Sequence, residues 1–219
     1  TYTSASSFPI FFAKSMRNSR HCLDFSGIYT GYLGSVDLVH LCTRVMEQFR
    51  EPDTLVMIDP AMADNGKLYT GFDENYVNAM RDFCKQADLI VPNVTEAAML
   101  LDRPYPKHAD CKTVGELLDG LLDLGIASVV ITGVSLEDGM LGAVAGNQKG
   151  ERFRYEIERI PAMFHGTGDL FASTMFGAVV RGMEFSKAIE LSVNFVGESI
   201  RKSMADPEGV WYGVNFEQR

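Results

Sequence analysis

The sequence predicts an α/β fold in which a mostly parallel central sheet carries helices on both faces. Short apolar runs alternate with segments of helical periodicity from about Gly27 onward. Such uninterrupted apolar runs are typical of parallel strands that are buried on both faces. The length of 219 residues also suits one domain with a sizeable core. We therefore expect residues 1–219 to form a single domain.

Each predicted strand is a short apolar or β-branched run that ends at a polar or turn-forming residue. The strands are expected at 27–31, 54–58, 89–91 and 128–131, followed by a hairpin of 141–144 and 152–157 around the turn signal Gly146-Asn147. The helices show helical spacing, as through Val39, Thr43 and Met46 in the first of them. They are expected at 36–49, 75–86, 95–101, 114–124, 170–181 and 186–203.

The composition argues against two broad classes of function. A net charge of −9 does not suit general nucleic-acid binding, which requires a basic surface. No apolar run approaches the ~18 residues of a membrane span, so we expect no membrane-spanning helix. The cysteines lie far apart without a CxxC pair, which indicates reduced thiols in a cytoplasmic protein rather than a zinc site or a disulfide framework. They are Cys22, Cys42, Cys84 and Cys111.

Residues 1–21 differ from the rest of the chain. They contain no Asp or Glu, are rich in Ser and carry Lys14, Arg17 and Arg20. Organellar transit peptides share this composition. Because the sequence does not begin with Met, we favour the interpretation that its natural start lies outside it.

The loop His165-Gly166-Thr167-Gly168-Asp169 is the strongest candidate for a chemical role. It precedes an apolar helical run, so its backbone amides would point outward at a helix N-terminus, where unpaired N–H groups and the helix dipole stabilise an anion. Asp169, in the first helical turn, is placed to accept a proton from a hydroxyl that attacks a phosphoryl group. The alternative is a tight turn followed by an Asp that complements the dipole.

Polar residues follow three of the predicted strands. Asp59 follows 54–58, Asn93 follows 89–91, and Thr132-Gly133 follows 128–131. In a parallel sheet the carboxyl ends of the strands meet at one edge, and ligands bind beyond that edge. The sequence therefore predicts that these residues line one site.

Two of these polar segments suit a metal ion and a nucleotide. Asp59 can hold Mg²⁺ directly or through water, although an Asp before Pro60 also simply forms turns. Asn93 can hydrogen-bond a phosphate or a metal-bound water, and Glu96 lies one turn further along the same helix. A plain helix start, with Thr95 as the cap, explains the Asn93–Glu96 spacing equally well.

The remaining candidates also have structural alternatives. Thr132-Gly133 offers a hydroxyl and an approachable backbone to a nucleotide phosphate, or it is an ordinary strand-to-loop turn. Asp64-Asn65-Gly66 is a tight-turn sequence. Tyr32 can contact an aromatic substrate, or it is a buried tyrosine with a satisfied hydroxyl.

Five segments carry a family resemblance. They are GYLGS at 31–35, DPAMADNGKLY at 59–69, PNVTEA at 92–97, VVITG at 129–133 and HGTGDLFAS at 165–173. In this order they resemble a bacterial-type pyridoxal or pyridoxamine kinase of the ribokinase superfamily, over most of the chain from about Gly27. The resemblance implies a ribokinase-like three-layer sandwich that acts as a homodimer. Its N-terminal strand and glycine-containing loop are not evident in residues 1–24.

The resemblance also implies a role for each candidate. Asp169 would be the general base on the substrate, and Gly166, Thr167 and Gly168 would form the anion hole. Asp59 and Glu96 would organise Mg²⁺, Tyr32 would contact the pyridine ring, and the residues near the ATP phosphates would be Asp64, Asn93, Thr132 and Gly133. Whether K⁺ assists is left open.

The expected activity is ATP-dependent phosphorylation of the 5′-hydroxymethyl group of pyridoxal, pyridoxine or pyridoxamine, which would salvage vitamin B6 to pyridoxal 5′-phosphate. Phosphoryl transfer of this kind depends mainly on positioning and charge neutralisation. Two alternatives stay open: a hydroxymethylpyrimidine kinase of the same superfamily, and a regulatory protein that binds a nucleotide or vitamin without turnover. The expected partners are a B6 vitamer and ATP.

Overall fold

A seven-stranded mixed sheet forms the centre of the structure, which is a computed structural model describing residues 10–14, 25–206 and 213–216. Strands β2, β3, β6 and β7 are parallel neighbours, β1 is antiparallel at one edge, and β8 and β9 are antiparallel at the other. Their order is β1 (Ile10–Lys14), β2 (Phe25–Thr30), β3 (Leu55–Ile58), β6 (Leu89–Ile90), β7 (Ser128–Val134), β8 (Met140–Asn147) and β9 (Arg152–Glu158).

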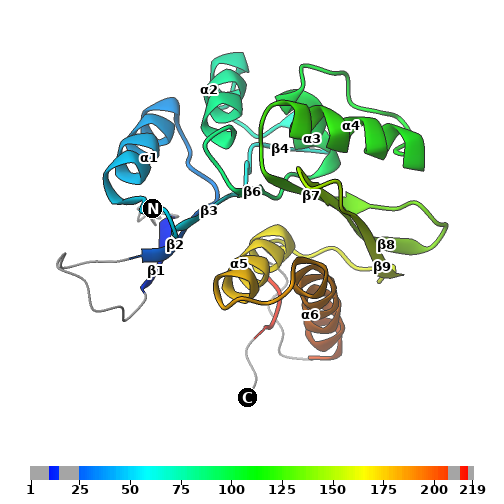
Figure 1. Cartoon of the computed structure of the whole chain (residues 1–219). Helices are drawn as coiled ribbons and strands as arrows, with labels where there is room; N and C mark the ends of the chain where they lie inside the picture. The colour runs from blue at the N-terminus through cyan, green and yellow to red at the C-terminus, as the bar shows by residue number, and fades with distance from the viewer. Residues whose placement is uncertain (1–9, 15–24, 207–212, 217–219) are drawn as a thin grey trace, which may run out of the picture.

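Helices cover both faces of this sheet (Figure 1). One face carries α1 (Val36–Phe49), α2 (Glu74–Cys84), α3 (Val94–Leu100) and α4 (Cys111–Asp123), and the other carries α5 (Thr167–Val180) and α6 (Phe185–Ala205). Successive residues of a strand point to opposite faces, so Ile28 packs in the core beneath α1–α4 while Tyr29 packs beneath α5 and α6. The predicted three-layer α/β fold is confirmed.

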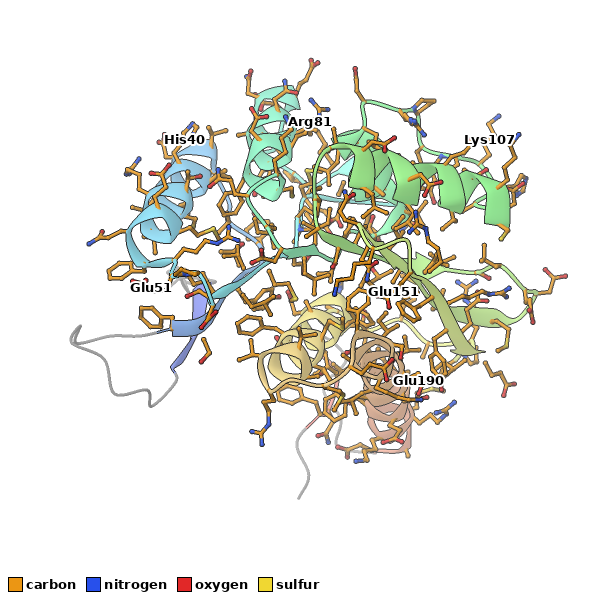
Figure 2. All side chains as sticks on the ribbon, in the orientation of Figure 1. His40, Glu51, Arg81, Lys107, Glu151 and Glu190 are labelled. Atoms are coloured by element: carbon orange, nitrogen blue, oxygen red, sulfur yellow. The ribbon has the colours of Figure 1, made fainter. Side chains whose placement is uncertain are left out.

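The outer surfaces of the layers carry the charged side chains. Figure 2 shows His40 on α1 and Lys107 ahead of α4 pointing away from the sheet, whereas the apolar side chains fill the space between the layers. In the part of the chain that the structure describes, no helix is both long and apolar enough to cross a membrane.

Most predicted elements lie within a few residues of their expected positions, and the differences have local causes. The turn between β8 and β9 falls at residues 148–150, just after the predicted Gly146-Asn147, because Gly146 still pairs with both β7 and β9 and Asn147 still pairs with β7. Strand β7 extends to Val134, so Thr132 and Gly133 lie inside its bounds, at a bulge where the β7–β8 register shifts.

Strand β1 and the two short strands of a small hairpin were not predicted. Strand β1 lies in the segment 1–24, for which the sequence indicated no element. Most of that segment, including most of the residues whose composition resembles a transit peptide, lies outside the described residues. The predicted tight turn Asp64-Asn65-Gly66 is confirmed, and it joins β4 (Ala63–Asp64) to β5 (Lys67–Leu68). Asn65 and Gly66 have φ values of 49° and 76°, the left-handed conformation that such a hairpin requires.

Candidate functional site

Asp59, Asn93 and Thr132 lie in a row at the carboxyl edge of the parallel strands. The Asp59 amide donates to the Thr30 carbonyl at 2.8 Å, and the Thr132 amide donates to the Pro92 carbonyl at 2.9 Å. Asn93 and Thr132 also form a parallel bridge. The backbone pairing thus continues past the strand ends, which brings the three polar residues to the same edge, as the strand order predicted.

The N-terminus of α3 is closed by its own side chains. The Asn93 Oδ1 accepts a hydrogen bond from the Glu96 amide at 2.9 Å, and the Glu96 Oε2 accepts one from the Asn93 amide at 2.8 Å. This is a capping box, in which each side chain satisfies the other's backbone donor. The interpretation with Thr95 as the cap is therefore wrong, because Asn93 precedes it and supplies the oxygen.

The same helix end holds the loop that carries Asp59 and Asp64. The Glu96 Oε1 accepts from the amides of Met62 at 3.0 Å and Ala63 at 3.4 Å. The Asn93 Nδ2 donates to the Ala63 carbonyl at 2.8 Å. The Thr95 Oγ1 accepts a hydrogen bond from the Gly66 amide at 3.0 Å. Asn93, Thr95 and Glu96 together fix the shape of this loop.

The N-terminus of α5 has the opposite character. Gly166, at the N-cap, has a φ of 84° and offers no side chain to the helix. The first backbone hydrogen bond of α5 runs from the Leu170 amide to the Gly166 carbonyl at 2.9 Å. Within the described residues, the amides of Thr167, Gly168 and Asp169 have no hydrogen-bond acceptor. Three donors at a positive helix end therefore remain available to an anion.

A second feature of this loop points to close approach by a ligand. Gly168 lies in the first turn of α5 with ordinary helical geometry, and a Cβ atom added to it would meet no atom within 4 Å. The protein itself thus does not require glycine there. His165, which precedes the loop, is exposed.

Acidic side chains gather between these two helix ends. Asp59 is 7% exposed and Glu96 is 3% exposed, whereas Asp169 remains accessible to solvent. Burial raises the pKa of Asp59 well above its usual value, and the nearby charges of Glu96 and Asp169 raise it further. Burial raises the pKa of Glu96 to about 7. Partial loss of hydration raises the pKa of the Asp169 carboxyl.

The acidic cluster also lacks a cationic ion-pair partner in the part of the chain that the structure describes. Among the described residues, no Lys, Arg or His side chain forms an ion pair with Asp59, Asp64, Glu96 or Asp169. The charge balance of the site therefore favours a bound cation.

The cluster does not form a complete metal cage. The described part of the chain contains no group of three or more His, Cys, Asp or Glu side chains arranged to hold a metal ion. Both oxygens of Glu96 already accept backbone amides. An incomplete set of this kind suits Mg²⁺, because this ion takes one or two carboxylates and completes its shell with water and phosphate oxygens.

Tyr32 lies in the loop between β2 and α1, next to Gly31, which adjoins Asp169. An ideal Cβ on Gly31 would lie 3.9 Å from the Asp169 Oδ1, so the two segments are adjacent. The Tyr32 side chain is 48% exposed, which rules out the alternative of a buried tyrosine. Its ring centroid is 5.3 Å from that of Phe72.

Two tyrosines at the site were missed from the sequence. Tyr29 lies in the apolar strand β2 and looked like a core residue, yet its hydroxyl is hydrogen-bonded by the Ser173 side chain, and the charges of Asp59 and Asp169 act on it. Tyr69 ends the segment DNGKLY, and burial together with the surrounding carboxylates raises its pKa to about 12. The Tyr69 amide also donates to the Met62 carbonyl at 2.9 Å, so Tyr69 lies next to the loop that Glu96 holds.

An open recess of about 430 Å³ lies at the same edge of the sheet. Strands β7 and β9 run in the same direction, because both are antiparallel to β8. The carboxyl end of β9 therefore lies at the same edge of the sheet as that of β7. The recess lies between the end of β9 and the end of α6, and its apolar lining includes Ile160, Pro161 and Met204.

Comparison with known proteins gives concordant matches. The family model described as phosphomethylpyrimidine kinase matches residues 9–211. A pyridoxal kinase of Arabidopsis thaliana is 30% identical over 87% of this chain and 62% of its own length. A Bacteroides thetaiotaomicron protein named as a phosphomethylpyrimidine kinase, crystallised with pyridoxal, superposes with a TM-score of 0.81 at 34% identity, over 87% of this chain and 68% of that one.

A further solved structure, Plasmodium falciparum PdxK with the ligands AMP-PNP and PL, has a TM-score of 0.74 at 27% identity. The superposition covers 88% of this chain and 69% of the Plasmodium falciparum chain. The chain spans 45–62% of the length of the first curated relatives that it matches. These matches confirm the ribokinase-like fold, and the chain belongs to the phosphomethylpyrimidine kinase family.

Proposed function

We propose that the full-length protein transfers the γ-phosphoryl group of ATP to the 5′-hydroxymethyl group of pyridoxal, pyridoxine or pyridoxamine. The observation that carries this proposal is the uncapped N-terminus of α5, where three unpaired amides and the Asp169 carboxylate lie on one turn. Its position beside the Tyr32 loop gives the acceptor hydroxyl a place near the base. The matches to proteins named pyridoxal kinase support the choice of acceptor.

In the proposed reaction Asp169 is the general base. The acceptor oxygen attacks the γ-phosphorus while its proton passes to the Asp169 carboxylate, and the bond from the γ-phosphorus to the β,γ-bridging oxygen breaks, releasing ADP. The raised pKa of Asp169 makes it a better proton acceptor than an exposed aspartate. Gly166, Thr167 and Gly168 would form the anion hole, in which the unpaired amides of Thr167 and Gly168, together with that of Asp169, would stabilise the charge on the phosphoryl oxygens.

The acidic cluster would hold Mg²⁺, which neutralises phosphate charge when bound. Asp59 would face the ion, and Glu96 would act through a bound water and through the loop that it holds. Asp64 and Asn93 would contact the nucleotide phosphates from that side.

The nucleotide would extend along the sheet edge away from Tyr32. Thr132 and Gly133 would contact its phosphates from β7, at the bulge where Gly133 has a φ of 69°. The recess beside Ile160 and Met204 offers apolar surface for the base. We also propose a homodimer, on the resemblance alone. The proposals of a single domain and a cytoplasmic location rest on the chain length and on the cysteine spacing. Dependence on K⁺ is left open.

A coupled ADP-release assay tests the activity. The full-length protein with ATP and Mg²⁺ is given pyridoxal, pyridoxine, pyridoxamine or hydroxymethylpyrimidine in separate reactions, each with and without K⁺. We expect vitamer-dependent turnover well above the rate with the pyrimidine. Faster turnover of hydroxymethylpyrimidine would favour the kinase for which the family is named. Binding of pyridoxal without any turnover would favour a regulatory protein.

A further inference from the structure

A row of three aromatic rings supports the acceptor side of the site. The rings of Phe72 and Tyr76 are stacked, with centroids 3.8 Å apart and an interplanar angle of 5°. The Tyr32 ring leans on the Phe72 ring at 5.3 Å and 35°. Exposure rises along the row, from 1% for Tyr76, through the half-buried Phe72, to 48% for Tyr32. Only the outermost ring therefore presents a large surface to a ligand.

The inner part of this row is fixed by a helix cap. Asp73 is the N-cap of α2, and its Oδ1 accepts a hydrogen bond from the Tyr76 amide at 3.0 Å. Phe72 directly precedes the cap, and its amide donates to the Tyr69 carbonyl at 3.2 Å. Since Tyr76 also packs in the core beneath α2, the Phe72 ring rests on a rigid base.

Tyr32 contacts the Phe72 ring and lies close to Gly34. It lies in a short loop between β2 and the Ser35 cap of α1, and the neighbouring Gly34 has a φ of 75°. A Cβ on Gly34 would lie 3.4 Å from the Tyr32 Cε1, so the glycine leaves room for the ring. Phe72 is the one ring whose stacking contact with Tyr32 is recorded in the described part of the chain.

We propose that Phe72 is a positioning residue that sets the affinity for an aromatic acceptor by holding the Tyr32 ring, which belongs to the loop that adjoins Asp169. This inference rests on the proposed kinase function. Phe72 itself touches neither the phosphoryl group nor the base in this account. Its loss should weaken acceptor binding and leave the transfer step and nucleotide binding unchanged.

The test compares Phe72→Leu with the wild-type full-length protein in the same coupled assay. The KM for pyridoxal should rise about 3- to 10-fold, the range of an aromatic pair contact, while kcat and the KM for ATP stay within twofold. Phe72→Tyr, which keeps the ring, should restore the wild-type KM. Phe153→Leu is the matched control, because Phe153 is a half-buried member of another aromatic pair, at the start of β9 and away from the site.

A double-mutant cycle identifies the route of the effect. If Phe72 acts through Tyr32, Phe72→Leu should add no further rise in KM to a Tyr32→Leu protein. Additive effects, or a wild-type KM in Phe72→Leu, would overturn the inference and leave the kinase proposal intact. Absence of vitamer-dependent turnover in the wild type would overturn both. Thermal unfolding checks each variant, and Phe72→Met replaces Phe72→Leu if the latter does not fold.

Discussion

Two helix N-termini contribute to the site from opposite faces of the sheet, and they are built in opposite ways. At α3, Asn93 and Glu96 close the helix end with a capping box and tie down the Asp59–Gly66 loop. At α5, a left-handed glycine starts the helix and supplies no cap. Side chains also cap α1, α2 and α4. The other uncapped helix, α6, begins after the α5–α6 turn, at the far end of α5 from the site.

The comparison separates structure from chemistry within one site. The polar groups at the start of α3 are mostly engaged by the protein itself, so we assign them to shaping the acidic loop. The amides at the start of α5 are left for a ligand, so we assign them to the phosphoryl group. Substitutions at α3 should therefore lower stability, whereas substitutions at the start of α5 should lower activity without lowering stability.

The largest effect is expected at Asp169. Asp169→Asn should lower turnover about 10²- to 10⁴-fold, because the general base is lost. Its unfolding free energy should not fall, since the change removes a carboxylate from an acidic cluster. Asp37→Asn is the matched control: Asp37 also lies in the first turn of a helix, α1, and should be silent. Equal losses in the two variants would contradict the assignment of Asp169.

A smaller effect, this time on stability, is expected at Glu96. Glu96→Gln places an amide donor against backbone donors that now bond to carboxylate oxygens. The free energy of unfolding should fall by about 1–3 kcal/mol, as measured by urea denaturation. An unchanged unfolding midpoint would show that the capping box does not stabilise the fold.

Glu96 should also make stability depend on pH. Its pKa is raised from 4.5 in the unfolded chain to about 7 in the folded protein, so between these values only the folded protein holds the proton. This contribution to stability is therefore complete below pH 4.5 and is lost as the pH rises to about 7. The decline should be shallower in Glu96→Gln. An identical dependence of stability on pH in the wild type and in Glu96→Gln would contradict the raised pKa of Glu96.

The sharpest comparison uses two glycines of α5. Gly168→Ala and Gly177→Ala both add a methyl group that meets no atom within 4 Å. Each should raise the unfolding free energy by ~0.5 kcal/mol, because alanine favours a helix more than glycine does. Only Gly168→Ala should lower kcat/KM, by about tenfold, since its methyl group enters the space assigned to the phosphoryl group. Equal activities would contradict that assignment.

The layers and the site edge could be predicted from the sequence because they depend on local patterns. The helix at 36–49 was predicted at its observed bounds, and the row of Asp59, Asn93 and Thr132 followed from the order of polar residues after strands. The tight turn at Asp64–Gly66 followed from its residue types.

Other features depend on contacts that no local pattern reports. The role of Glu96 in holding Met62 and Ala63 arises from residues more than 30 positions apart. Tyr29 reads as a core residue of an apolar strand, and only the packing of β2 against α5 brings its hydroxyl to Ser173. The Phe72 ring likewise meets Tyr32 only after α1 and α2 pack side by side.

Amide hydrogen exchange, followed residue by residue, tests the contrast between the two helix ends most directly. The full-length protein is measured alone and with Mg²⁺, ADP, aluminium fluoride and pyridoxal. The Asn93 and Glu96 amides should be protected in both states, whereas those of Thr167, Gly168 and Asp169 should become protected only in the complex. Protection of the α5 amides without ligand, or no gain of protection in the complex, would contradict the account.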